Sequence, residues 1–130
     1  MIFVDSCFYI ALADKKDQWH TKARNLTKYV ENKETVISDL IISEVLTEIG
    51  KRSGGKKAHQ IFEYFIDNCE IIYVNSDLLV ESESHFLKFD GTLSLADAVS
   101  ATIMLQKGIW DILSFDSDFD KVDGINRICE

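Results

Sequence analysis

The residues Met1 to Cys7, MIFVDSC, constrain the fold more than any other stretch. Three apolar residues lead directly into Asp5, and a helical pattern begins straight after it. A short run of apolar, β-branched and aromatic residues predicts a strand buried on both faces, as in parallel sheets. Asp5 then stands at the carboxyl end of that strand, where the ligand crevices of open α/β sheets form. A carboxylate there either caps the next helix or takes part in chemistry.

The rest of the chain alternates predicted strands with predicted helices. Four further strands are expected, at residues 35–38, 70–74, 109–114 and 125–129. Helices are expected at residues 6–13, 18–31, 39–50, 58–68, 76–89 and 94–108. This alternation implies parallel pairing with right-handed crossovers, and hence an α/β fold with a three-layer α/β/α sandwich. Residues 51–57, KRSGGKK, are expected to form a basic turn that is either solvated or in contact with RNA or a partner.

Composition restricts the classes of function. A hydrophobic content of 46% and a length of 130 residues are typical of one soluble globular domain, which we expect to span residues 1–130. The net charge of -8 argues against binding nucleic acid through the overall field, but it allows a metal-dependent nuclease, because a bound cation supplies positive charge locally. No apolar run approaches the roughly 20 residues of a membrane span. The widely spaced Cys7, Cys69 and Cys129 indicate reduced thiols and a cytoplasmic location.

Three acidic residues stand where an isolated charge is costly. Asp5 ends a buried strand, Asp116 follows the fourth predicted strand, and Asp97 lies in the most apolar helix. Asp97 has a second interpretation as the last residue of a capping box, Ser94-x-x-Asp97, at the start of its helix. Glu44 lies beside the apolar stripe of its own helix, so its pattern alone is that of a surface glutamate.

These four carboxylates repel one another if they converge at one edge of the sheet. At an effective dielectric constant near 20, two charges about 6 Å apart repel by roughly 3 kcal/mol, so the group costs on the order of 10 kcal/mol. That energy is comparable to the stability of a whole domain, and the group therefore needs protons or cations. Oxygen ligands suit Mg²⁺ or Mn²⁺, and such ions promote the hydrolysis of phosphate esters.

Four segments together resemble the PIN-domain family, and more narrowly the small toxins of bacterial and archaeal VapBC toxin–antitoxin pairs. They are the strand leading into Asp5-Ser6, SDLIISEVLTEI around Glu44, LSLADAVSAT around Asp97 and ILSFDSDFDKV around Asp116. They occur in the family's order and spacing over essentially the full chain. The resemblance implies a five-stranded parallel sheet of order 3-2-1-4-5 and a ribonuclease that depends on Mg²⁺ or Mn²⁺.

The resemblance also assigns roles by position. The implied catalytic quartet is Asp5, Glu44, Asp97 and Asp116. The implied metal ligands are Asp5, Asp97 and Asp116, while Glu44 is a further ligand or orients the attacking water. Auxiliary roles fall on Ser6, Ser114 and Asp118, with Ser114 at a position where threonine is common. The implied partners are an RNA substrate, a cognate antitoxin and a second copy of the chain in a homodimer.

Other functions stay open at this point. The DSDFDK run has aspartates at alternate positions, as a calcium loop does, but Lys121 and Arg127 replace the glycine and the bidentate glutamate of that loop. A phosphatase with an aspartate nucleophile after the first strand requires a second aspartate where Cys7 stands. The same fold also serves a binding or adaptor protein with little nuclease turnover, or a housekeeping RNA-processing nuclease.

Overall fold

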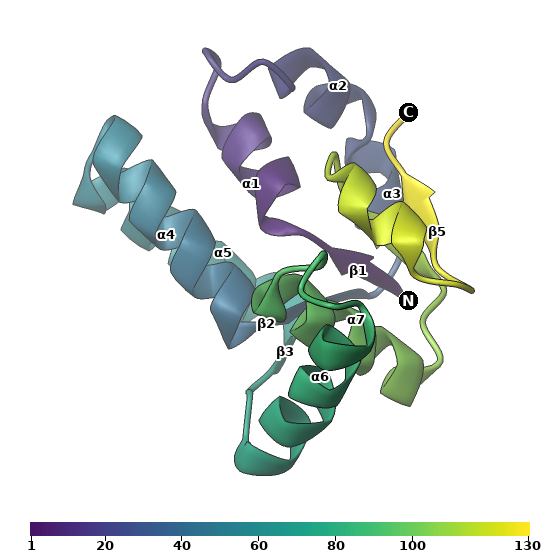
Figure 1. Cartoon of the computed structure of the whole chain (residues 1–130). Helices are drawn as coiled ribbons and strands as arrows, with labels where there is room; N and C mark the ends of the chain where they lie inside the picture. The colour runs from purple at the N-terminus through teal and green to yellow at the C-terminus, as the bar shows by residue number, and fades with distance from the viewer.

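Five short strands form one parallel sheet at the centre of the computed structural model, which describes all 130 residues (Figure 1). The strands are β1 (Ile2–Val4), β2 (Thr35–Ser38), β3 (Cys69–Ile72), β4 (Asp111–Leu113) and β5 (Asn126–Ile128). Their order is β3-β2-β1-β4-β5, and every neighbouring pair is parallel. The predicted α/β class and the predicted strand order are therefore confirmed.

Helices cover both faces of this sheet. They are α1 (Ser6–Ala13), α2 (His20–Asn25), α3 (Thr27–Glu31), α4 (Asp39–Ser53), α5 (Gly55–Asn68), α6 (Ser76–Lys88), α7 (Leu95–Lys107) and the short 3₁₀ helix η1 (Ser117–Lys121). The chain steps from β1 to β2 to β3 in one direction and then returns to β4, so right-handed crossovers place α1–α5 on one face and α6–α7 on the other (Figure 1). No helix is both long enough and apolar enough to cross a membrane.

The central strand β1 forms the middle of the hydrophobic core. Ile2, Phe3 and Val4 are fully buried, because β2 and β4 flank the strand and helices cover it. These residues belong to one contiguous cluster of 24 buried side chains, and each large one stabilises the fold by about 1.5–3 kcal/mol. Since parallel strands end at the same edge, Asp5 after β1 and Ser114 after β4 are brought side by side.

The predicted single helix over residues 18–31 is wrong. The structure has two helices, α2 and α3, separated at Leu26. The N–H of Leu26 is shared between the carbonyls of Lys22 and Ala23, which tightens the turn, and the Thr27 hydroxyl donates to the carbonyl of Arg24. This bend allows Ala23 and Leu26 to be buried together, which a continuous periodic pattern does not reveal.

The glycines after α4 also differ from the prediction. α4 continues through Gly50 and ends at Ser53, because Ile49 is fully buried and helical packing outweighs the weak preference of a glycine. Gly54, with φ 89°, makes the true break, since a positive φ is easily adopted only by glycine. The expected basic turn over residues 51–57 is therefore two helix ends that meet at Gly54. Similarly, α6 is capped by Asn75 rather than by Ser76 or Asp77.

Candidate active site

The carboxyl edge of the sheet gathers acidic residues from four separate segments. Asp5 follows β1 and caps α1, and Asp116 follows β4 and caps η1. Asp97 lies in the first turn of α7, while Glu44 projects from the second turn of α4. The charges of Asp5, Asp116 and Glu44 all act on the Asp97 carboxyl. The structure therefore brings together the four acids that the sequence singles out.

Asp5 is the most buried of them, with 5% of its surface exposed. Its Oδ1 accepts the N–H of Ser6 at 2.9 Å, and its Oδ2 accepts the Ser114 hydroxyl at 2.7 Å and the Cys7 thiol at 3.5 Å. Burial raises the pKa of the Asp5 carboxyl above its usual value, although the donors from Ser114, Ser6 and Cys7 oppose that rise. These contacts hold the carboxylate in one orientation.

Glu44 lies on the surface, as its sequence pattern suggests, yet it is tied to the site. The Ser6 hydroxyl donates to its Oε2 at 2.7 Å, while the N–H of the same serine binds Asp5. Ser6 thus holds two acids of the quartet at once. A groove of about 450 Å³ begins beside Glu44 and runs along α4, and it is lined by Ile10, Ser43, Glu44, Thr47, Glu48 and Arg52.

Asp97, Asp116 and Asp118 form the tightest group, which we call the acidic edge. One carboxylate oxygen from each lies within 4.8 Å of the other two. Burial, followed by the charges of Asp5 and Asp116, raises the pKa of Asp97 to about 7. Ser94 accepts the N–H of Asp97 at 3.0 Å, so the capping interpretation is also correct. Lys121 lies 3.0 Å from Asp118, at the outer side of the group.

The acidic edge differs in one member from the ligand set that the sequence suggests. That set is Asp5, Asp97 and Asp116, whereas the closest oxygens belong to Asp97, Asp116 and Asp118. Asp118 joins them because η1 turns tightly after Asp116, whose carboxylate accepts the N–H of Asp118 at 2.9 Å. All donors are carboxylate oxygens, a set that suits hard divalent cations.

Cys7 occupies a place in the site that the sequence does not reveal. Its thiol donates to Asp5, lies 3.6 Å from the Ser114 hydroxyl and accepts the N–H of Phe115 at 3.3 Å. Burial, with the charge of Asp5, raises the pKa of this thiol to about 12, so it stays protonated and unreactive. Ser114 completes the link, since it donates to Asp5 and accepts the N–H of Asp116 at 3.0 Å. The position of Cys7, two residues after Asp5, is the only sequence signal.

The geometry removes the calcium-loop alternative. Asp120 forms a bidentate ion pair with Arg127, at 2.9 and 3.0 Å, which offsets its charge. Asp120 is therefore paired with Arg127 and is not part of the acidic edge. The histidines lie elsewhere: His20 contacts the carbonyl of Ala11, His59 pairs with Glu63 and His85 with Thr102.

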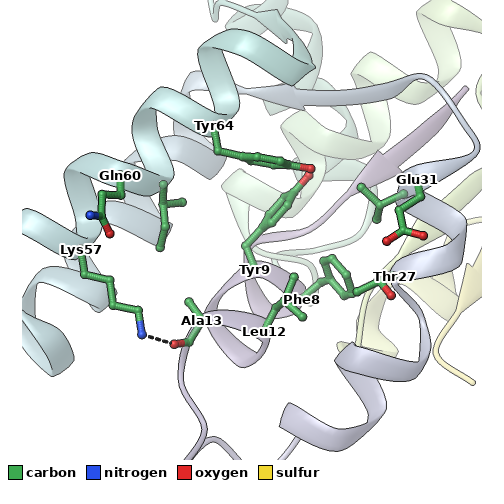
Figure 2. Close-up of a pocket in the computed structure, with 11 residues that line it drawn as sticks. Phe8, Tyr9, Leu12, Ala13, Thr27, Glu31, Lys57, Gln60 and Tyr64 are labelled. Carbon is green, nitrogen blue, oxygen red and sulfur yellow. Dashed lines mark hydrogen bonds between the residues drawn. The ribbon is translucent and has the colours of Figure 1, made fainter.

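A second hollow, of about 480 Å³, lies between α1, α3 and α5 (Figure 2). Its walls are mainly apolar, and in Figure 2 the hydroxyl ends of Tyr9 and Tyr64 converge, with the two rings edge to face at 61°. Lys57 at its rim donates to the carbonyl of Ala13. None of the four acids of the quartet lines this cavity.

The chain is similar to known proteins over most of its length. A model of the PIN domain matches residues 2–125. The chain is 29% identical over 123 residues to a protein of Mycobacterium tuberculosis, the 23S rRNA-specific endonuclease VapC20, and the match covers 92% of each chain.

Solved structures share the fold. The crystal structure of Mycobacterium tuberculosis VapC20, described as a sarcin–ricin loop cleaving toxin, has a TM-score of 0.82 at 26% identity and covers 93% of this chain and 94% of its own. VapBC2 from Rickettsia felis, bound to a promoter DNA fragment, has a TM-score of 0.70 at 14% identity, with 98% of both chains covered. A toxin–antitoxin complex from Klebsiella pneumoniae has a TM-score of 0.74 at 16% identity, covering 97% of this chain and 96% of that one. The chain belongs to the PIN-domain family.

Proposed function

We propose that this protein is a metal-dependent endoribonuclease that hydrolyses RNA phosphodiester bonds, and that it is the toxin of a toxin–antitoxin pair. The observation that carries the proposal is the acidic edge, three carboxylates within 4.8 Å in a chain of the PIN-domain family. The similarity to an rRNA-specific endonuclease over 92% of the chain supports it.

The residues present fit a Mg²⁺ or Mn²⁺ ion. We assign Asp97 and Asp116 as its ligands, supported by the 4.8 Å limit that joins their carboxylate oxygens to that of Asp118, and Asp5 as a third ligand, supported by the effect of its charge on Asp97. Burial, followed by the charges of Asp5 and Asp116, raises the pKa of Asp97 to about 7, and a bound cation would relieve the part that is repulsion between carboxylates. Such a cation, when bound, lowers the pKa of a bound water and neutralises charge on the phosphate.

The remaining residues position these groups. Glu44 is exposed at the end of the groove along α4, where its carboxylate can orient a water and accept its proton. The hydroxyl of Ser6 fixes Oε2 of Glu44, and the hydroxyl of Ser114 fixes Oδ2 of Asp5. Each serine hydroxyl is committed to a carboxylate of the quartet, so we assign the two serines positioning roles and not nucleophilic ones.

We place the protein in the cytoplasm as a single domain over residues 1–130. Its proposed partners are an RNA substrate, a second copy of the chain in a homodimer and a cognate antitoxin that silences it by covering the acidic edge. A structured RNA is the preferred substrate class, because the similar VapC20 is described as cleaving the sarcin–ricin loop.

The test compares cleavage of a sarcin–ricin loop hairpin, a scrambled hairpin and total RNA in Mg²⁺, Mn²⁺, Ca²⁺ or EDTA. Discrete cuts that require Mg²⁺ or Mn²⁺ and disappear in Asp97→Asn are expected. Cuts spread over many transcripts without growth arrest would favour a housekeeping nuclease. Absence of cutting in every metal, or equal cutting by the variant, would contradict the proposal and favour a binding or adaptor protein.

A further inference from the structure

We propose that Arg52 is a positioning residue for the site, which ties the helix that carries Glu44 to the strand end that carries Asp116. This inference rests on the nuclease function proposed above. Arg52 lies at the end of the α4 groove opposite Glu44. It belongs to the basic segment 51–57, for which the sequence left a contact with RNA open as an alternative.

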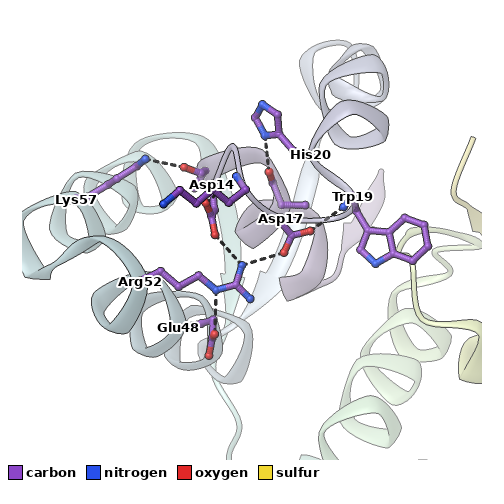
Figure 3. A network of polar contacts seen from close by, with 10 residues as sticks. Asp14, Asp17, Trp19, His20, Glu48, Arg52 and Lys57 are labelled. Carbon is purple, nitrogen blue, oxygen red and sulfur yellow. Dashed lines mark hydrogen bonds and ion pairs between the residues drawn. The ribbon is translucent and has the colours of Figure 1, made fainter.

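Arg52 is held by three carboxylates, and we call Arg52 with these residues, Asp14, Asp17 and Glu48, the Arg52 cluster (Figure 3). Its Nε donates to Glu48 at 2.9 Å within α4. Its Nη1 donates to Asp14 at 3.0 Å and to Asp17 at 2.9 Å, both in the loop between α1 and α2. The guanidinium therefore joins the last turns of α4 to a loop on another segment.

The charge balance of the cluster argues against a contact with RNA. Three carboxylates surround one guanidinium, so the cluster carries a net negative charge and repels a phosphate. Hydrogen bonds to Asp17, Glu48 and Asp14 raise the pKa of Arg52 further above its usual value. The cation is already committed to partners within the chain.

Asp17 links the Arg52 cluster to the residues beside Asp116. Its Oδ2 accepts Arg52, and its Oδ1 accepts the N–H of Trp19 at 2.9 Å (Figure 3). The Trp19 ring stacks on Phe115, with centroids 5.3 Å apart and planes at 15°. Phe115 directly precedes Asp116 in the sequence, so the loop that Arg52 fixes supports the β4 end of the acidic edge.

The other end of the contact lies on α4. Glu48 follows Glu44 by one helical turn, and both line the groove whose far end is Arg52. Because α1 packs on α4 and supplies Ser6 to Glu44, the spacing of these two helices sets where the Glu44 carboxylate stands. Arg52 therefore supports Glu44 through α4 and Asp116 through Asp17, Trp19 and Phe115.

The experiment compares Arg52→Ala and Trp19→Ala with the matched control Arg24→Ala, which removes an exposed cation that forms no ion pair. Cleavage and Mn²⁺ binding, the latter by electron paramagnetic resonance, are measured well below each variant's melting temperature. We expect Arg52→Ala and Trp19→Ala to lower kcat by about 10-fold or more and to weaken Mn²⁺ binding by a similar factor, as removal of supporting residues around metal sites does. KM is expected to change by less than about threefold, because no RNA contact is removed.

Arg52→Lys separates geometry from charge, since an ammonium lacks the planar fork that spans these carboxylates. We expect it to recover only part of kcat. Values of kcat and Mn²⁺ affinity in Arg52→Ala equal to those of Arg24→Ala would overturn the inference, and so would an effect confined to KM. If the wild-type protein cuts no RNA, the proposed function fails, whereas the Mn²⁺ titration still decides the positioning role.

Discussion

Two regions of this molecule each gather three carboxylates, and they differ in what offsets the charge. In the Arg52 cluster a guanidinium lies within 3.0 Å of all three. At the acidic edge the oxygens lie within 4.8 Å of one another, and the one ion pair that involves them joins Lys121 to Asp118, leaving Asp97 and Asp116 without a paired cation. The carboxylates of the Arg52 cluster are paired with a cation of the chain itself, whereas Asp97 and Asp116 are not.

The pKa values record this difference. The N–H of Lys16, followed by the hydrogen bond from Arg52, lowers the pKa of Asp14 below its usual value. Burial and neighbouring charges raise the pKa of Asp97 to about 7. A cluster of carboxylates with a raised pKa at the end of the central strands does not serve stability and is typical of a functional site. Substitutions in the two regions are therefore expected to have opposite consequences.

Asp116→Asn is expected to produce the largest effect, because it removes one carboxylate charge of the acidic edge while the amide oxygen of asparagine can still cap η1. Cleavage should fall by about a thousandfold, since a metal's charge on the reacting phosphate is worth several kcal/mol. A single-turnover assay with excess protein measures it. The control is Asp123→Asn, which makes the same charge change at an exposed residue and should cleave RNA at the wild-type rate. If Asp116→Asn also cleaves at the wild-type rate, the acidic edge is not the active site.

Ser114→Ala tests how Asp5 is held without a cation. In this variant Oδ2 of Asp5 keeps only the weak thiol donor of Cys7, and the N–H of Asp116 loses its acceptor, the Ser114 hydroxyl. The free energy of unfolding should fall by about 1–3 kcal/mol and cleavage by about tenfold. Urea denaturation with and without Mg²⁺ measures the first. The buried Ser82→Ala, whose hydroxyl bonds only its own helix, should leave cleavage intact, and an equal loss there would argue against a specific role for Ser114.

The pH dependence of the metal-free protein follows from Asp97. Its pKa in the folded state is about 7, above the usual aspartate value of 3.8, so folding favours the protonated form. This contribution to stability is fully present below about pH 4 and is lost as the pH rises through about 7. After a discount for solvent exposure, the loss amounts to about 1–2 kcal/mol.

Asp97→Asn should therefore raise the melting temperature of the metal-free protein at about pH 8 by about 5 °C and leave it nearly unchanged at about pH 4. Mg²⁺ should produce a similar rise in the wild-type protein at high pH and a much smaller one in the variant. Thermal scans in EDTA and in Mg²⁺ measure both effects. A lower melting temperature of the variant at high pH would refute the raised pKa.

Glu48→Gln is the smallest change and acts in the opposite direction. It replaces one of the carboxylates paired with Arg52 by a neutral amide at a side chain that is 38% exposed, and the charge of an exposed pair of this kind contributes about 0.5 kcal/mol. The free energy of unfolding should fall by about that amount, and the difference should vanish at about 1 M NaCl, where the Debye length is about 3 Å. Chemical denaturation at two salt concentrations tests it, with the exposed Glu83→Gln as control. A gain in stability would mean that the Arg52 cluster carries unrelieved repulsion too.

The alternation of apolar segments predicts the α/β class, and it marks Asp5, Asp97 and Asp116 because these acids interrupt or end apolar segments, whereas the strand order follows only from the resemblance to the PIN-domain family. Glu44 is recognisable only by resemblance, since it is exposed on its helix. Asp118 joins the edge through the tight turn of η1, which no periodicity marks. The break at Gly54 and the partners of Arg52 depend on contacts between distant segments, and local patterns carry no information about those.

The hydrogen bond from Ser114 to Asp5 joins residues 109 positions apart in the chain. Until β4 has been synthesised and has paired with β1, the central strand lacks one neighbour and Asp5 lacks its strongest donor. Before the segment after β4 has been synthesised, the chain lacks Asp116 altogether, and Asp5, Glu44 and Asp97 are not yet joined by it. The acidic site can therefore form only after β4 and η1 have been synthesised and β4 has paired with β1.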